Sequence, residues 1–167
     1  MSKFRIKKTQ GLLDSLEDQL VKEFRSCQSL YILTKEERLA LSLNNVQDLS
    51  SLVERKLALV DELVQLEQAR HTVTREMGDA LGLKHPSPGV SDILSSLDQD
   101  AAHRLSRLLE GILAVTGYVR DLTQGNQALT ETALEQTHAA QAFLLDLNPS
   151  LSSSLEINQE NETRPLF

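Results

Sequence analysis

The residues of this chain best suited to binding a metal ion are four histidines, which stand far apart in the sequence. They are His71, His85, His103 and His138, and none has a second histidine at metal-ligand spacing. Metal sites in helical bundles combine inward carboxylates with Glu-x-x-His pairs on facing helices. We therefore predict no metal site and no cofactor.

The strongest nucleophile is Cys27, the only cysteine, which lies in a helical apolar pattern. A single thiol cannot form an intrachain disulfide, so we interpret Cys27 as a buried structural residue. Adjacent acidic pairs such as Glu36–Glu37 point to different sides of a helix and are interpreted as solvated faces. The chain contains no glycine-rich phosphate loop and no Gly-x-Ser-x-Gly motif. We therefore predict that it is not an enzyme.

Two basic residues, Lys56 and Arg70, occupy apolar positions of a heptad pattern and are two heptads apart. A buried cation needs a carboxylate or carbonyl partner. In one interpretation both stems pack while the charged heads reach the surface. In the other they pair with acidic residues of the preceding helix, such as Glu23 or Glu37, and fix its register.

Asn126 interrupts the longest apolar seam of the chain. A single asparagine in such a seam can set the register and the number of partner helices. The alternative is that Asn126 marks the point where the core opens and a binding surface begins. Beyond it the seam is diluted by alanine and glutamine, before Phe143, Leu144, Leu145 and Leu147. Apolar surface there would cap the bundle, form a dimer or recognise a partner helix.

Long helices must position these residues. Between residues 101 and 147 the apolar positions recur in steps of four and three for about six heptads, without a proline. A helix of this length cannot be stable by itself in water, so it needs partner helices. The seam consists of Ala101, Leu105, Leu108, Ile112, Val115, Val119, Leu122, Asn126, Leu129, Ala133, Gln136, Ala140, Phe143 and Leu147.

The partners are two preceding helices, at about residues 10–44 and 46–81, after a basic lead-in that we expect to be poorly ordered. Asn44–Asn45 is the expected break, because asparagine tolerates the left-handed conformation at a helix end and caps the next helix. The proline-containing stretch Lys84–Gly89 is the clearest interruption. We expect Ser87 or Ser91 to cap a short helical turn at about residues 92–97.

The predicted fold class is all-α. It is an antiparallel three-helix bundle or coiled coil with one long C-terminal helix at 101–147, forming a single domain over residues 1–147. Residues 148–167 are rich in serine, asparagine and glutamate, a composition that does not support a packed element. We predict a mobile C-terminal tail.

Composition restricts the partners. The formal net charge is −7, and four of the basic residues fall in the first eight positions, so the remainder is more acidic still. This argues against nucleic acid, because phosphate binding needs a basic surface. No apolar run approaches the ~20 residues of a membrane span, so no stable membrane insertion is expected. No secretory signal is evident, and we expect a cytoplasmic protein.

The order of these motifs resembles the FlgN family of flagellar export chaperones over roughly residues 13–147. The resemblance rests on the succession of two helices with a short break, a proline-containing connection and one long helix with an asparagine. It is carried by Glu37-x-x-x-Leu41, Asn44-Asn45, Leu49-x-x-Leu52, Lys56-x-x-Leu59-x-x-x-Leu63-x-x-Leu66-Glu67-x-x-Arg70, Asn126-x-x-Leu129 and Phe143-Leu144-Leu145.

The resemblance implies a cytoplasmic chaperone that binds hook-associated proteins, prevents their premature assembly and delivers them to the flagellar type III export apparatus. In this family the C-terminal part of the long helix and the segment after it contact the cargo. Residues 152–167 lack the tyrosine- and glycine-containing tail frequent in the family. The cargo-binding residues that the resemblance implies are Leu129, Leu134, Phe143, Leu144 and Leu147.

A different class of protein fits the same heptads. A structural coiled-coil adaptor or dimerisation module would also present long amphipathic helices, and a homodimer would cover the end of the long helix. The residues expected to set the helix register in either case are Lys56, Arg70 and Asn126.

Overall fold

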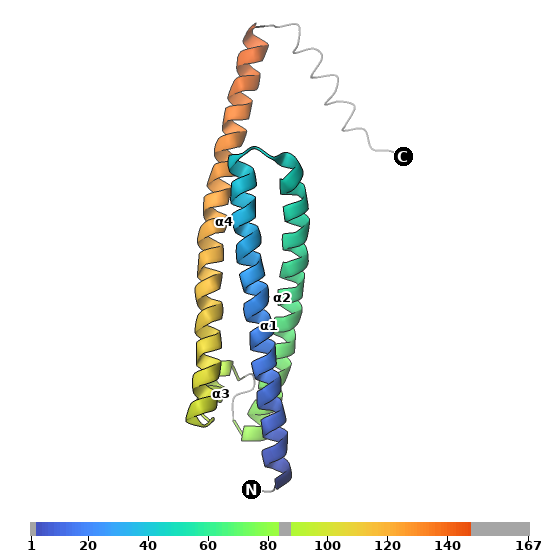
Figure 1. Cartoon of the computed structure of the whole chain (residues 1–167), viewed down its shortest axis with the longest axis vertical. Coiled ribbons are helices and arrows are strands. Elements are labelled where there is room, and N and C mark those ends of the chain that lie inside the picture. The colour runs from blue at the N-terminus through green and yellow to red at the C-terminus, as the bar shows by residue number, and fades with distance from the viewer. Residues whose placement is uncertain (1–2, 84–87, 148–167) are drawn as a thin grey trace, which may run out of the picture. The chain divides into compact units, whose positions relative to one another are not determined.

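Helices form every regular element in the part of the chain that the structure describes. The computed structural model describes the backbone of residues 3–83 and 88–147, and the side chains of 9–83 and 88–147. The helices are α1 (Lys3–Ser42), α2 (Val46–Leu81), α3 (Val90–Leu94) and α4 (Gln99–Leu147), shown in Figure 1. This architecture confirms the all-α fold class. The predicted tail, residues 148–167, lies outside the described residues.

The chain divides into two units, Met1–Asn126 and Gln127–Phe167. The first unit contains α1, α2, α3 and the part of α4 up to Asn126; the second contains the rest of α4. The single domain expected over residues 1–147 stays a prediction.

Helix α1 begins at Lys3, earlier than the start near residue 10 expected from the sequence. The basic lead-in is therefore helical from Lys3 onward. The reason lies in helix cooperativity: nucleation is costly, but an existing helix extends easily through residues that do not break it. No glycine or proline lies between Lys3 and Gln10.

The break between α1 and α2 falls where the sequence placed it. Asn44 has a positive φ of 51°, in the left-handed region. The Asn45 side-chain oxygen accepts a hydrogen bond from the backbone N–H of Asp48, at 3.2 Å, and so caps α2. The Asn45 amide donates to the Asp48 carboxylate at 2.6 Å. These bonds satisfy a backbone donor at the start of α2 and confirm the Asn44–Asn45 break.

The connection from α2 to α4 is built differently from the expectation. Gly82 ends α2 with a φ of 78°, and the Leu83 N–H donates to the Gly78 carbonyl at 2.9 Å, as in a Schellman ending. Of the two expected caps, Ser91 is wrong, because Ser91 lies inside α3, and Ser87 lies outside the described residues. The Asp92 carboxylate instead accepts from the Gly89 N–H at 2.8 Å.

Helix α4 starts at Gln99, two positions before the expected start. The Asp98 carboxylate accepts a hydrogen bond from the Ala101 N–H at 2.9 Å and caps this helix. Aspartate is among the preferred N-cap residues, so the sequence did contain the signal.

The main apolar core joins all four helices at one end of the first unit. The short helix α3 contributes Ile93, which has no exposed surface, and so closes the space between α2 and α4. A smaller cluster of Leu33, Ala40 and Leu52 lies between α1 and α2 near their connection. The main core consists of Leu13, Leu16, Leu20, Met77, Val90, Ile93, Ala101 and Leu105.

Helix α1 runs parallel to α4 with a constant register. Arg104 bonds Glu17, residues that are 87 apart in the sequence. Tyr118 and Tyr31 have the same sequence separation of 87, and their ring centroids are 6.2 Å apart. The same separation also relates Gly111 to Phe24 and Gly125 to Arg38. The four α4 residues recur every seven positions, so they form one heptad row facing one row of α1.

Two glycines in this row make room for large side chains of α1. A Cβ added at Gly111 would lie 2.9 Å from Cε2 of Phe24, and one at Gly125 would lie 3.0 Å from Nη1 of Arg38. Both glycines therefore allow a close approach between α4 and α1. Gly117 has nothing within 4 Å of its added Cβ.

This difference predicts opposite outcomes for two alanine substitutions in α4. Gly117→Ala should raise the free energy of unfolding by about 1 kcal/mol, because alanine has the higher helix propensity and meets no neighbour. Gly111→Ala should raise the free energy of unfolding by less than Gly117→Ala does, or lower it, because the added Cβ displaces the Phe24 ring. Urea denaturation followed by circular dichroism measures both. Equal stabilisation by the two substitutions would contradict the close approach of Phe24.

Candidate functional site

The second unit presents exposed apolar side chains along the last turns of α4. The exposed fractions are 37% for Leu129, 55% for Leu134, 62% for Phe143, 57% for Leu144 and 66% for Leu147. These are the five residues that the family resemblance singled out as cargo-binding. Their exposure makes them available to a partner, while their role stays a prediction.

Helix periodicity divides the five residues into two groups. At about 100° per residue, Leu129, Phe143 and Leu147 fall within about 40° of one another, and Leu144 lies about 60° from Leu129. Leu134 lies about 140° from Leu129, on a different side of the helix. We call Leu129, Phe143, Leu144 and Leu147 the α4 apolar stripe.

In the first unit the three long helices meet at one carboxylate. Oε2 of Glu37, on α1, accepts a hydrogen bond from Nζ of Lys56 at 2.8 Å. The same atom accepts from Nδ2 of Asn126 at 2.7 Å, and that amide also donates to the Thr34 carbonyl at 3.0 Å. The side chains of Lys56 and Glu37 are only 18% and 15% exposed. Lys56 and Asn126, two of the three residues expected to set the register, therefore share Glu37 as their acidic partner.

The third register residue forms a separate ion pair. Nε of Arg70 donates to Oε1 of Glu23 at 2.8 Å, and its guanidinium also lies 3.5 Å from the exposed Glu67. The pKa of the Glu23 carboxyl is raised above its ordinary value, because burial disfavours the charged form more than Arg70 favours it. Of the two interpretations left open for Lys56 and Arg70, pairing with α1 is the one confirmed.

These pairs reveal a heptad row of α1 that the sequence analysis missed. Glu23 and Glu37 are two heptads apart on α1, as their partners are on α2. Ser26 and Leu33 lie at intervening heptad positions on the same side of α1: Ser26 donates to Glu62 at 3.0 Å, and Leu33 packs with Leu52. Phe24, Cys27 and Tyr31 lie beside this row on α1 and contact α4. The sequence did contain a signal for this row, because Glu23 and Glu37 have the same spacing of fourteen residues as Arg70 and Lys56.

Cys27 is buried, as expected, and its thiol lies 4.0 Å from the Thr116 hydroxyl of α4. Burial raises the pKa of this thiol, which lowers its thiolate fraction at neutral pH. A buried thiol with little thiolate is a poor nucleophile, so its position suits a packing residue.

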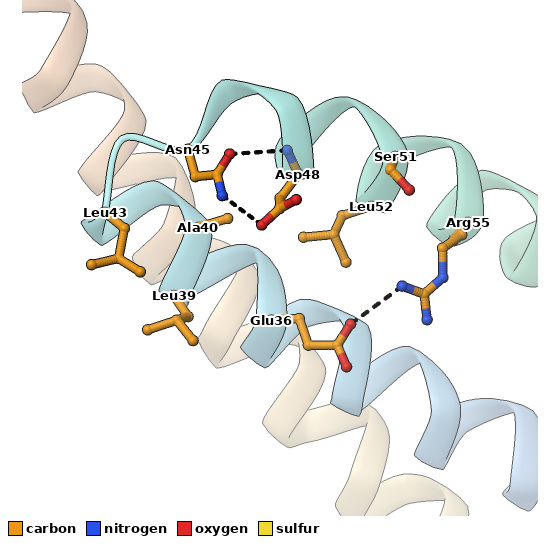
Figure 2. Close-up of a pocket in the computed structure, with 9 residues that line it drawn as sticks. All are labelled: Glu36, Leu39, Ala40, Leu43, Asn45, Asp48, Ser51, Leu52 and Arg55. Carbon is orange, nitrogen blue, oxygen red and sulfur yellow. Dashed lines mark hydrogen bonds and ion pairs between the residues drawn. The ribbon is translucent and has the colours of Figure 1, made fainter.

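A groove runs between α1 and α2 near their connection. One pocket, of about 320 Å³, lies among Leu39, Leu43 and Leu52 and reaches Arg55. Figure 2 shows this pocket, with the Arg55 guanidinium aimed across it at Glu36, 3.4 Å away. A second pocket, of about 360 Å³, continues on the other side of Arg55 beside Ile32 and Leu59. No motif in the sequence indicated this groove.

Neither a membrane span nor a metal-binding cluster occurs in the described residues. Over residues 3–83 and 88–147, no helix is long and apolar enough to cross a membrane. In the same part of the chain, no three histidine, cysteine, aspartate or glutamate residues are grouped so as to hold a metal ion.

Comparison with known proteins gives one match. The family model described as FlgN protein matches residues 5–152, which is most of the chain. No curated protein and no solved structure matches it.

The shared carboxylate predicts a large difference between two neighbouring glutamates. Glu37→Ala should lower the free energy of unfolding by about 2–3 kcal/mol, because it leaves the largely buried Lys56 ammonium without its carboxylate and removes one bond donated by the Asn126 amide. Glu36→Ala removes only an exposed contact to Arg55 and should cost less than about 1 kcal/mol. Urea denaturation measures both variants. Equal losses would show that the Lys56–Glu37–Asn126 cluster contributes no more than a surface pair.

The raised pKa of Glu23 predicts the sign of a pH effect. Since the folded state holds this proton more tightly, the contribution to stability is fully present below the unfolded pKa and is lost as pH rises through the folded pKa. The free energy of unfolding of the wild type, minus that of Glu23→Gln, should therefore fall as pH rises from about 4 towards neutral. Denaturant titrations at a series of pH values measure this difference. A rise over the same range would mean that Arg70 outweighs burial.

Proposed function

Because this chain belongs to the FlgN family of flagellar export chaperones, we propose that it binds hook-associated proteins before their export. In the proposed cycle it acts in the cytoplasm, holds the C-terminal segments of these proteins, prevents their premature assembly and delivers them to the type III export apparatus. Its role is to hold a partner, and no catalytic step is involved.

The observation that carries this proposal is the α4 apolar stripe. Large apolar side chains exposed on one side of a helix are characteristic of helix-pairing and helix-in-groove recognition. Leu129, Phe143 and Leu147 extend over eighteen residues of sequence, which corresponds to about 27 Å of helix. This length matches an amphipathic helix of several turns in the bound protein.

The physical task is to cover apolar surface that has no partner yet. Segments that pair only in an assembled filament are amphipathic and unprotected beforehand, so their apolar faces promote aggregation. Docking such a face on the α4 apolar stripe removes both surfaces from water, which is favourable by roughly 25 cal/mol per Å² of apolar area.

Release at the export apparatus requires moderate affinity. The α4 seam contains alanine and glutamine between its large residues, at Ala133, Gln136 and Ala140. Small and polar residues bury less apolar area than leucine would, which limits the lifetime of the complex. A seam of this composition therefore favours a reversible complex over an obligate one.

Calorimetry with the isolated C-terminal segment of a hook-associated protein from the same organism tests the proposal. The full chain should bind this segment stoichiometrically. Phe143→Glu and Leu147→Glu should each weaken binding about tenfold or more, because a charge would be buried against an apolar face. Leu134→Glu should have a smaller effect, since Leu134 lies on a different side of the helix.

Leu113→Glu is the matched control, because Leu113 is an exposed leucine of α4 in the first unit. It should leave binding unchanged. Absence of binding by the wild type, together with a dimer in light scattering that Phe143→Glu dissociates, would replace the proposal with a structural dimerisation module.

A further inference from the structure

The groove between α1 and α2 is a second surface suited to a partner, built from residues other than the α4 apolar stripe. Its rim carries Ile32, Leu39 and Leu43, which are 55%, 60% and 68% exposed. Exposed large apolar side chains beside two open pockets are unfavourable in water unless a partner covers them. The pockets fall at the lower end of the volumes typical of ligand sites.

The two pockets are one heptad apart. Ile32 and Leu33 line one pocket, and Leu39 and Ala40, seven residues later on α1, line the other. On α2 the corresponding residues are Leu59 and Leu52, again seven apart. Seven residues of α-helix span about 10.5 Å. A helix lying along the groove would therefore place side chains seven residues apart into the two pockets.

Arg55 lies at the boundary and lines both pockets. Its guanidinium has five N–H donors. Within the described residues its one ion pair is the 3.4 Å contact with Glu36, and both side chains are about half exposed. Such a pair contributes little and exchanges readily. By contrast, Asp48 in the same groove is held by the Asn45 amide (Figure 2). Glu36 lines one pocket only, whereas Arg55 lines both, so the charge placed to meet a side chain between the two pockets is a cation with donors to spare.

We propose that this groove docks an amphipathic helix of another protein, with two apolar side chains seven residues apart and a carboxylate between them. The apolar side chains enter the two pockets, and the carboxylate accepts hydrogen bonds from Arg55 in place of Glu36 or beside it. Arginine and carboxylate match in bidentate geometry, which sets the position of the helix along the groove.

A pair of synthetic helical peptides tests this proposal. Both carry leucines seven residues apart; one has glutamate at the position between them, and the other has lysine. Fluorescence anisotropy with the full chain should show that the glutamate peptide binds about tenfold more tightly. Arg55→Glu should reverse this preference. Glu36→Gln should strengthen binding of the glutamate peptide, because it removes the carboxylate that competes for Arg55. Leu39→Glu should weaken both peptides.

Three control variants test whether the peptides bind specifically in this groove. Arg75→Glu and Leu113→Glu change exposed residues of the same types elsewhere and should leave binding unaffected. Phe143→Glu should also leave it unaffected, which makes the result independent of the proposed cargo site. Equal binding of both peptides, a preference that survives Arg55→Glu, or loss in Leu113→Glu would overturn the proposal. A wild-type dimer that Leu39→Glu dissociates would overturn it too, since the occupant would then be a second copy.

Discussion

The structure of the first unit depends on two largely buried carboxylates of α1 that hold cations of α2. Glu23 pairs with Arg70 and Glu37 with Lys56, at equal spacing on both helices. A slip of α2 along α1 would leave these charges without partners in a partly dehydrated interface, which is far more costly than exchanging one leucine for another. A leucine-rich seam alone specifies register weakly, because its successive layers are alike. The two ion pairs favour one register of α2 along α1 over the others, because only that register gives each cation a carboxylate partner.

The same carboxylate connects this pair of helices to α4. Because Glu37 accepts from both Lys56 and Asn126, the position of α4 along α1 is tied to that of α2. The heptad row containing Gly111 and Gly125 follows the same parallel register, with each glycine opposite a large side chain. Asn126 is also the last residue of the first unit. Asn126 therefore bonds α1 at the residue where the first unit ends. That it sets the helix register stays a prediction.

Holding and releasing a partner places different demands on the two units. The first unit contains the apolar core, the capped helix ends and the buried ion pairs, and it can be stable with no partner bound. The second unit has exposed leucines and Phe143 along one helix, so its apolar surface is free for binding. The α1–α2 groove adds a site on the stable unit, where the surrounding helices are already fixed and binding orders few side chains.

The helical fold class, the Asn44–Asn45 break and the burial of Cys27 could be predicted from the sequence, because they follow from local periodicity, capping chemistry and residue type. The sequence also indicates its own exceptions. It identified Lys56, Arg70 and Asn126 as exceptional, since polar residues in an apolar seam need partners. It placed the start of α1 and the cap of α3 wrongly, because helix extension and competition between caps depend on small local energies. Tertiary packing determines which carboxylates the cations meet, why Gly111 and Gly125 lack side chains and where the α1–α2 groove opens. Each of these depends on side chains brought together from distant parts of the sequence, and heptad spacing is the same for every register that the helices could adopt.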